Sequence, residues 1–275
     1  MRIFPERTWR SILWAIFRIA LISYIFYGVL IYVKQDGLLY YPDQTPFADC
    51  VDVSPATMVD MNGTRGYFYQ NGTSTKLAVL YHGNADRACG RAFYRTAFEH
   101  AGYSWLIVEY AGYANDVDTK GNMRLPSTKR ILDDVKNVDE WVRAQRPTTL
   151  AIVGESIGTG PASFHSSRAT PDALILLAPF DRLSLLAQEL YPLYPIAYML
   201  REDYDNMMWA STAGRVLIVH GDADTIIPIR YALNLFAHLP QEDKTFVTLP
   251  NVDHNESFGI TQTQQAILKF LKETP

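Results

Sequence analysis

Short apolar runs alternate with amphipathic segments through most of this chain. The runs predict buried strands at 76–81, 104–110, 150–153, 173–178, 215–220 and 244–249. Between them, apolar residues recur with helical spacing and predict helices at 88–101, 127–146, 161–168, 229–238 and 261–272. Strands that alternate with helices in this way are typical of a mostly parallel sheet covered on both faces. An Asn62-Gly63 pair between two short runs in 58–69 predicts a β-hairpin at the edge of that sheet.

The segment 12–33 breaks the alternation, because it is apolar or aromatic on every helical face. As a helix it would be about 33 Å long, and a bilayer's hydrocarbon core is about 30 Å thick. Its one charged residue, Arg18, lies near the N-terminal end, where its side chain can reach the interface. A cleaved signal peptide or a soluble amphipathic helix are the alternatives. No small-x-small cleavage site follows Val33, so we expect an uncleaved transmembrane anchor.

Charges around this segment predict its orientation. Arg2, Arg7 and Arg10 precede it, whereas Lys34 stands beside Asp36 after it. The positive-inside rule then places residues 1–11 in the cytoplasm and the remaining chain on the other side of a single-pass membrane protein.

The chain after this segment is long enough for a single α/β domain. Residues 34–56 contain several prolines and predict an extended linker, and 57–275 predict an α/β domain. Within it, 181–214 separates two strands by a long stretch rich in Leu, Tyr, Met and Trp. Because ligands bind at the carboxyl edge of such sheets, we expect a small helical cap with an apolar inner face there. A two-helix connection packed on the core is the alternative.

Net charge and cysteine content limit the kinds of partner and site that the chain is expected to have. The chain has 275 residues and a net charge of -4, with no basic run beyond its N-terminus, which gives no reason to expect nucleic acid as a partner. Its two cysteines, Cys50 and Cys89, form no disulfide framework or metal site, and can be paired or free. Asn62 and Asn71 each start an N-glycosylation pattern, which turn chemistry explains equally well.

The candidate chemistry begins at Gly154-Glu-Ser-Ile-Gly158, which lies between a predicted strand and a predicted helix. In that context the pattern predicts a nucleophile elbow, a tight turn that presents the Ser156 hydroxyl at its tip. The backbone N–H of Ile157 and that of Asn84, after another strand, are our candidates for an oxyanion hole. We expect His82, two residues before Asn84, to be structural. Glu155 is either a turn residue or a residue that selects the substrate.

Two more strand ends carry the other groups that a serine nucleophile needs. Asp222 and Asp224 follow the strand at 215–220, and His254 follows the strand at 244–249. Imidazole takes the proton of the serine hydroxyl, and a carboxylate fixes the imidazole's tautomer. Ser156, Asp224 and His254 have the chain order of the α/β-hydrolase triad. Asp222, and more remotely Asp253, are alternative acids, and the remaining histidines (His100, His165, His220 and His238) fit solvated or packed positions.

These motifs resemble the α/β-hydrolase superfamily, in particular its membrane-anchored α/β-hydrolase domain-containing branch of esterases, lysophospholipases and protein depalmitoylases. The similarity rests on His82-Gly-Asn84, the elbow, His220-Gly-Asp-Ala-Asp224 and Asp253-His-Asn255. Glu109-Tyr-Ala-Gly-Tyr113 is similar to the Asp-Tyr-Arg-Gly-Tyr-Gly stretch of that group but departs from it at three positions. The resemblance implies an α/β-hydrolase fold over about residues 35–275, with Ser156, Asp224 and His254 as the triad.

The sequence therefore predicts a membrane-anchored serine hydrolase that cleaves acyl esters or thioesters and uses no metal or organic cofactor. Its expected partners are the membrane, through the N-terminal helix, and a small-molecule or lipid-like acyl substrate. A serine aminopeptidase or amidase on the same fold is the alternative, since Glu155, Glu202, Asp203 and Asp205 offer acids for a substrate amine. A non-catalytic anchored binding protein is a third hypothesis. The oligomeric state is not predicted.

Overall fold

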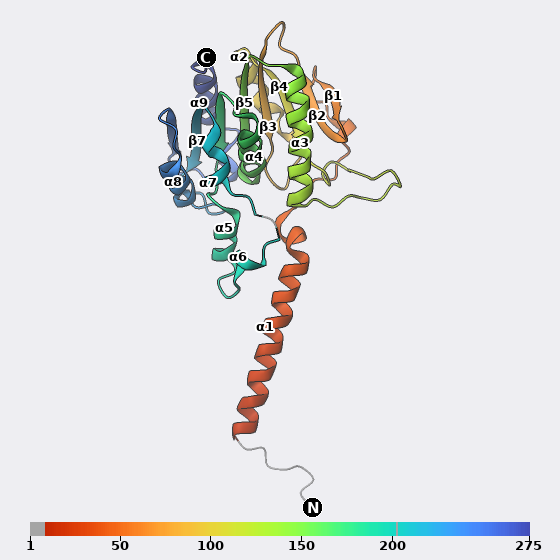
Figure 1. Ribbon diagram of the computed structural model, residues 1–275, viewed down its shortest axis with the longest axis vertical. Helices are drawn as coiled ribbons and strands as arrows, with labels where there is room; N and C mark the ends of the chain where they lie inside the picture. Colours follow the sequence, from red (N-terminus) through yellow and green to blue (C-terminus); the bar gives the residue numbers. More distant parts are fainter. Residues whose placement is uncertain (1–8, 202) are drawn as a thin grey trace, which may run out of the picture.

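The computed structural model describes residues 9–201 and 203–275, and within them an eight-stranded sheet organises the domain (Figure 1). The strands are β1 (Thr57–Met61), β2 (Thr64–Tyr69), β3 (Lys76–Tyr81), β4 (Ser104–Glu109), β5 (Thr149–Glu155), β6 (Ala173–Leu177), β7 (Arg215–Gly221) and β8 (Lys244–Leu249). Their order in the sheet is β1-β2-β4-β3-β5-β6-β7-β8. Pairing is antiparallel between β1 and β2 and between β2 and β4, and parallel from β4 through β3 to β8, so the predicted hairpin does form one edge of a mostly parallel sheet.

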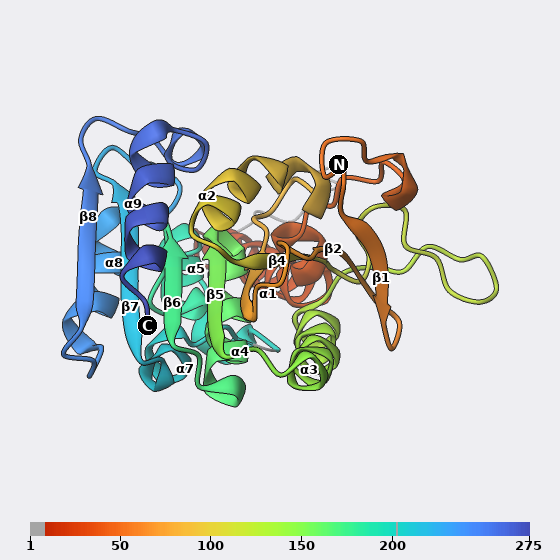
Figure 2. The same ribbon diagram turned by 90° about the horizontal axis from the view of Figure 1, so that it is seen from above.

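Helices cover both faces of this sheet. The α-helices are α1 (Trp9–Leu39), α2 (Arg95–His100), α3 (Thr128–Gln145), α4 (Thr159–Ala169), α5 (Leu183–Leu190), α6 (Ile196–Met199), α7 (Asn206–Trp209), α8 (Ile229–His238) and α9 (Thr261–Lys272). Short 3-10 turns are η1 (Phe47–Asp49), η2 (Ala88–Tyr94), η3 (Ser156–Gly158), η4 (Ala210–Thr212) and η5 (Asn255–Ser257). Viewed from above, α2 and α9 lie on one side of the strands, and α3 and α4 lie on the other (Figure 2).

Side-chain periodicity explains the two cores between these layers. Along β3, Leu77, Val79 and Tyr81 face the core under α3, α4 and α8, whereas Ala78 and Leu80 face the core under α2 and α9. Successive strand residues point to opposite faces, so an uninterrupted apolar run buries both of them. On α3 the buried valines and isoleucine recur at three- and four-residue intervals, and Ser127 caps its N-terminus by accepting the Arg130 amide.

Two predicted segments differ from the structure. α1 continues through Leu39, so its last turns occupy residues expected to be extended linker. The first proline after Val33 is Pro42, so the helix can continue past the apolar segment into residues 34–39. The predicted helix at 88–101 is divided into η2 and α2, with Gly90, a weak helix former, inside the first of them.

The long segment 181–214 combines both alternatives expected for it. Its second half packs on the core, since the Trp209 ring meets that of Phe164 on α4 edge to face, with centroids 5.1 Å apart. Its first half, α5 and α6, projects from the sheet edge and lies beside the C-terminal part of α1 (Figure 1). α1 is itself long and apolar enough to cross a membrane. The basic residues Arg2 and Arg7 lie outside the described residues.

Candidate active site

Ser156 stands at the turn between β5 and α4, in a backbone conformation that few L-residues adopt. Its φ is 53°, in the left-handed region, and strain of this kind is typical of nucleophile elbows. The two elbow glycines are required by close approach. A Cβ on Gly154 would lie 2.6 Å from the Cβ of Ala162, and one on Gly158 would overlap the carbonyl oxygens of Tyr81 and His82. The turn therefore brings the start of α4 against β3 and raises the serine above the sheet.

A chain of two hydrogen bonds connects Ser156 to a buried acid. Ser156 Oγ lies 2.9 Å from His254 Nε2, and His254 Nδ1 lies 2.6 Å from Asp224 Oδ2. His254 and Asp224 are both buried. With the Nδ1 proton donated to Asp224, Nε2 is free to accept the serine proton. The three predicted residues, from loops after β5, β7 and β8, thus meet at one edge of the sheet.

Asp224 is held as a carboxylate by its surroundings. Its Oδ1 accepts the amides of Ile226 and Ile227 at 2.9 and 2.8 Å, and its Oδ2 also lies 3.2 Å from Nε2 of His220. Burial disfavours the charge, but the hydrogen bonds from His220 and His254 outweigh burial and hold the pKa of Asp224 well below its ordinary value. The sequence did not predict His220 as a neighbour of the acid, although its place near the end of β7, four residues before Asp224, was a usable signal.

The two rival acids have other contacts. Asp222 Oδ1 accepts the amide of Asn251 at 2.6 Å, and Asp253 Oδ1 accepts the amide and hydroxyl of Thr225 at 3.0 and 3.1 Å. Both are exposed and fasten the loop after β7 to the loop after β8. They support the position of His254 from outside. The Asp253 carboxylate accepts the His254 backbone amide, whereas the imidazole bonds Asp224 and Ser156.

The Gly83–Asn84 backbone, predicted to form part of an oxyanion hole, lies beside Ser156. A Cβ on Gly83 would be 3.5 Å from the Cβ of Ser156. The Asn84 side chain fixes this loop, because its Oδ1 accepts the Tyr41 amide at 2.9 Å and the Tyr113 hydroxyl at 3.0 Å. His82 is fully buried and bonds Glu109 at 3.1 Å, which agrees with a structural role. The Asn84 and Ile157 amides remain predicted oxyanion donors.

Glu155, next to Ser156, is fully buried in an ion pair. Its Oε1 accepts Arg91 Nε at 2.8 Å, its Oε2 accepts the Tyr94 hydroxyl at 3.1 Å, and Arg91 also pairs with Asp86. Burial lowers the pKa of Arg91, but Glu155 and Asp86 outweigh it and raise that pKa above its ordinary value. The same carboxylate would be 2.7 Å from a Cβ on Gly83, so the pair packs directly behind the Gly83–Asn84 loop. A disulfide from Cys50 to Cys89 ties down η2, the turn that carries Arg91.

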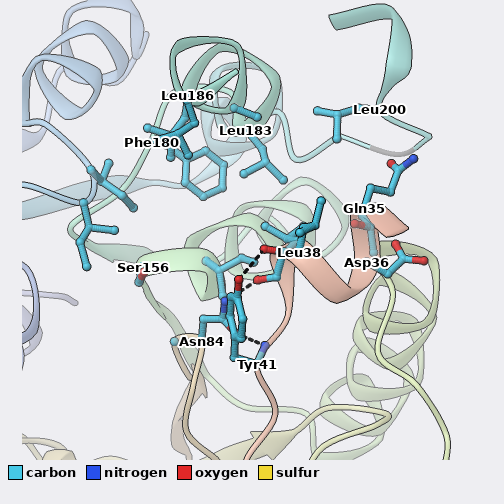
Figure 3. Close-up of a pocket in the computed structure, with 18 of the residues that line it drawn as sticks. Gln35, Asp36, Leu38, Tyr41, Asn84, Ser156, Phe180, Leu183, Leu186 and Leu200 are labelled. Carbon is cyan, nitrogen blue, oxygen red and sulfur yellow. Dashed lines mark hydrogen bonds between the residues drawn. The ribbon is translucent and has the colours of Figure 1, made fainter. Parts of the chain in front are cut away.

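A cavity of about 760 Å³ opens above Ser156 and His254. Its apolar walls come from the segment 181–200 and, unexpectedly, from the last turns of α1 (Figure 3). Figure 3 shows Leu38 and Gln35 of α1 facing Leu183 and Leu200 across this space. The acids that line it are already paired, Glu155 with Arg91 and Asp36 with Arg201 at 2.6 Å.

The architecture now identifies the fold. Over 86% of this chain and 97% of its own, an esterase of Pyrococcus furiosus superposes with a TM-score of 0.66 at 13% sequence identity. The chain has the α/β-hydrolase fold. Resemblance to esterase and lipase structures confirms the predicted fold class.

Two sequence relatives cover different shares of the chain. An uncharacterized protein of Mycobacterium tuberculosis is 29% identical over 272 residues, which are 93% of this chain and 94% of the relative. The lysophosphatidylserine lipase ABHD12 of Danio rerio is 27% identical over 188 residues, which are 59% of this chain and 47% of the lipase. No protein-family model matches the chain.

Proposed function

We propose that this α/β-hydrolase is a membrane-tethered serine hydrolase that cleaves acyl esters or thioesters. The observation that carries the proposal is the hydrogen-bonded series Ser156, His254 and Asp224 at the floor of an apolar cavity. The similar proteins named as an esterase and a lipase support ester hydrolysis as the reaction class.

The reaction would proceed in two half-reactions. Ser156 Oγ attacks the acyl carbon while His254 Nε2 takes its proton, and the Asn84 and Ile157 amides stabilise the tetrahedral oxyanion. His254 then gives the proton to the leaving alcohol or thiol as the carbon–leaving-group bond breaks, which leaves an acyl-Ser156 ester. Water, deprotonated by His254, attacks that ester, and the acid product and free Ser156 are released.

An aminopeptidase or amidase would need a carboxylate available for the substrate's amine. Among the described residues, the acids that were candidates for this task are engaged: Glu155 with Arg91, Asp203 with the Ser184 amide, and Asp205 with Arg182. Glu202 lies outside the described residues. The ester and thioester reaction is therefore preferred.

The tether would be α1, with the catalytic domain on the non-cytoplasmic side. Arg10 precedes the apolar part of α1, and the Cys50–Cys89 disulfide fits an oxidising compartment. Protease protection in oriented membrane vesicles tests this orientation. Digestion of the domain from the cytoplasmic face would contradict it.

The nucleophile is tested with a fluorophosphonate probe on the full-length protein in detergent. We expect labelling of the wild type and of Ser127→Ala, a matched control whose serine also lines the cavity, and no labelling of Ser156→Ala. Equal labelling of the wild type and Ser156→Ala would overturn the assignment and favour a non-catalytic binding protein. Faster turnover of aminoacyl amides than of acyl esters would favour the aminopeptidase.

A further inference from the structure

The end of the segment 181–200 carries no charge, and several of its large apolar side chains are exposed. Residues 190–200, here called the cap tip, read Leu-Tyr-Pro-Leu-Tyr-Pro-Ile-Ala-Tyr-Met-Leu and contain no charge. Leu190, Leu193 and Tyr198 are 67%, 78% and 91% exposed. A contiguous apolar surface of this kind marks a site that contacts another apolar phase.

Side chains supply several of the hydrogen-bond partners that the non-helical backbone of the cap tip needs inside a bilayer. The Gln188 amide group donates to the carbonyls of Tyr191 and Tyr194 and accepts the Ile196 N–H at 2.9 Å. The Tyr24 hydroxyl of α1 donates to the Leu193 carbonyl at 2.8 Å. Non-helical backbone is tolerated at membrane depth only where protein groups replace water as hydrogen-bond partners.

The cap tip is docked along the part of α1 proposed to span the membrane. The Tyr194 ring stacks on that of Tyr24 with centroids 4.7 Å apart, and it lies over Gly28, where a Cβ would approach it to 3.2 Å. Farther along α1, the Arg201 amide bonds Gln35 at 2.9 Å.

These contacts define a depth for the cap tip. Along the axis of α1, Tyr24 and Gln35 are about 16 Å apart. The headgroup region of one leaflet is about 5–7 Å thick, and the rest of that distance lies in hydrocarbon. With Gln35 and Asp36 among the headgroups, Leu193 and Tyr194 lie about 10 Å inside the hydrocarbon of one leaflet, which is a depth that interfacial helices reach.

The cavity connects this depth to the nucleophile. Ile31 and Leu38 of α1 form one wall, and Leu186, Leu190 and Ile196 form the wall opposite. From Ile31 to Leu39 the α1 wall covers about 12 Å of helix rise, along which an extended acyl chain can lie. At the other end of the same cavity are Ser156 and His254.

We propose that the acyl chain of a membrane-resident ester passes from the leaflet between α1 and the cap tip to reach Ser156. In this arrangement α1 is a wall of the acyl-binding site as well as a tether. The inference rests on the proposed hydrolase function and adds the source of the substrate, a lipid ester held in the bilayer.

Filling the entrance tests this route. Ile31 is half-buried and lines the cavity, whereas Val29, two residues earlier on α1, is 56% exposed and does not. In phosphatidylcholine vesicles, Ile31→Trp is expected to slow hydrolysis of an embedded palmitoyl ester by about tenfold or more, as a misfitted apolar pocket does. Ile31→Trp should slow hydrolysis of a water-soluble acetyl ester much less, because so short an acyl chain does not extend along the α1 wall, and Val29→Trp should behave as the wild type with both esters.

The outcomes separate this inference from the proposed function. Equal rates of Ile31→Trp and Val29→Trp on the palmitoyl ester would overturn the route through α1. An unchanged rate with the vesicle ester but a slower rate with a dispersed long-chain ester would also overturn it, because the cavity would then fill from water. Failure of the wild type on every ester would count against the hydrolase function itself.

A second measurement does not depend on activity. Leu193→Cys, labelled with an environment-sensitive fluorophore, should be quenched by brominated phosphatidylcholine in vesicles. Met58→Cys on β1, 59% exposed, is the control and should not be quenched. The native cysteines are joined to each other, so each variant carries one labelled thiol. Absence of quenching at Leu193 would overturn insertion of the cap tip.

Discussion

The ion pair of Glu155 and Arg91, next to Ser156, can be probed by Glu155→Gln, which preserves the shape of the side chain and removes its charge. Glu155 is fully buried, and the Arg91 side chain is only 13% exposed. Solvent therefore screens the pair weakly. Removing one partner of a buried ion pair typically destabilises a protein by about 3–5 kcal/mol, because the other charge stays buried. We expect a loss of that size, which lowers Tm by roughly 6–20 °C in a domain of this length.

The same substitution should reduce turnover, because the Glu155 carboxylate packs against Gly83 beside the nucleophile. Loss of one oxyanion donor costs about 10²–10³-fold in kcat, and a loosened loop should give a part of this, about tenfold or more. The matched control is Tyr94→Phe, which keeps the ion pair and removes one 3.1 Å hydrogen bond, at about 1 kcal/mol.

Thermal unfolding in detergent and acetyl-ester kinetics on the three proteins measure both effects. A Tm for Glu155→Gln within the range of Tyr94→Phe, together with wild-type kcat/KM, would refute the reasoning. A lower Tm with unchanged kcat/KM at a temperature where the variant is folded would restrict Glu155 to a purely stabilising role. That result would also remove the proposed support for the Gly83–Asn84 loop.

Three further predictions concern other parts of the domain. Asp224→Asn should lower kcat by about 10⁴-fold through the wrong imidazole tautomer, whereas Asp222→Asn should stay within a few-fold of the wild type; the reverse order in ester kinetics would identify Asp222 as the acid. Cys50→Ser opens a disulfide with a sequence separation of 39 residues, which should cost about 4 kcal/mol in denaturant titration; an unfolding curve that is unchanged, and insensitive to reductant, would show that the bond does not form. Burial lowers the pKa of His165 from 6.5 to about 4, so the unfolded chain takes up this proton first and stability is lost as the pH falls through that window, by about 3 kcal/mol in all. His165→Gln should therefore lose less stability than the wild type between pH 7 and pH 4, and parallel losses in the two proteins would contradict the role of His165.

Local patterns were enough to predict most of the secondary structure. α8, β8 and α9 begin and end at the predicted residues, since their apolar periodicity and flanking turn residues are local properties. The Asn62-Gly63 hairpin formed as expected, because both residues adopt the positive φ that its turn requires. The order of the Ser, Asp and His motifs along the chain predicted the α/β-hydrolase fold.

Contacts between distant segments were decided only by the tertiary structure. Asp222 and Asp224 share one loop and one residue type, and only the position of His254 distinguishes them. The pairing of Arg91 with Glu155 depends on the same convergence of loops at the sheet edge. Such contacts join residues far apart in the chain, so no periodicity or spacing records them.

The role of α1 shows this division most clearly. Its length and apolar composition predicted a membrane-spanning helix, because the thickness of a bilayer sets those two properties directly. Its place in the cavity wall depends on Tyr24, Gln35 and Asp36 meeting the segment 193–201, more than 160 residues away along the chain. The hydrophobicity of a helix is set by residues that are neighbours in the sequence. The residues that line one pocket are set by where the folded sheet places its loops.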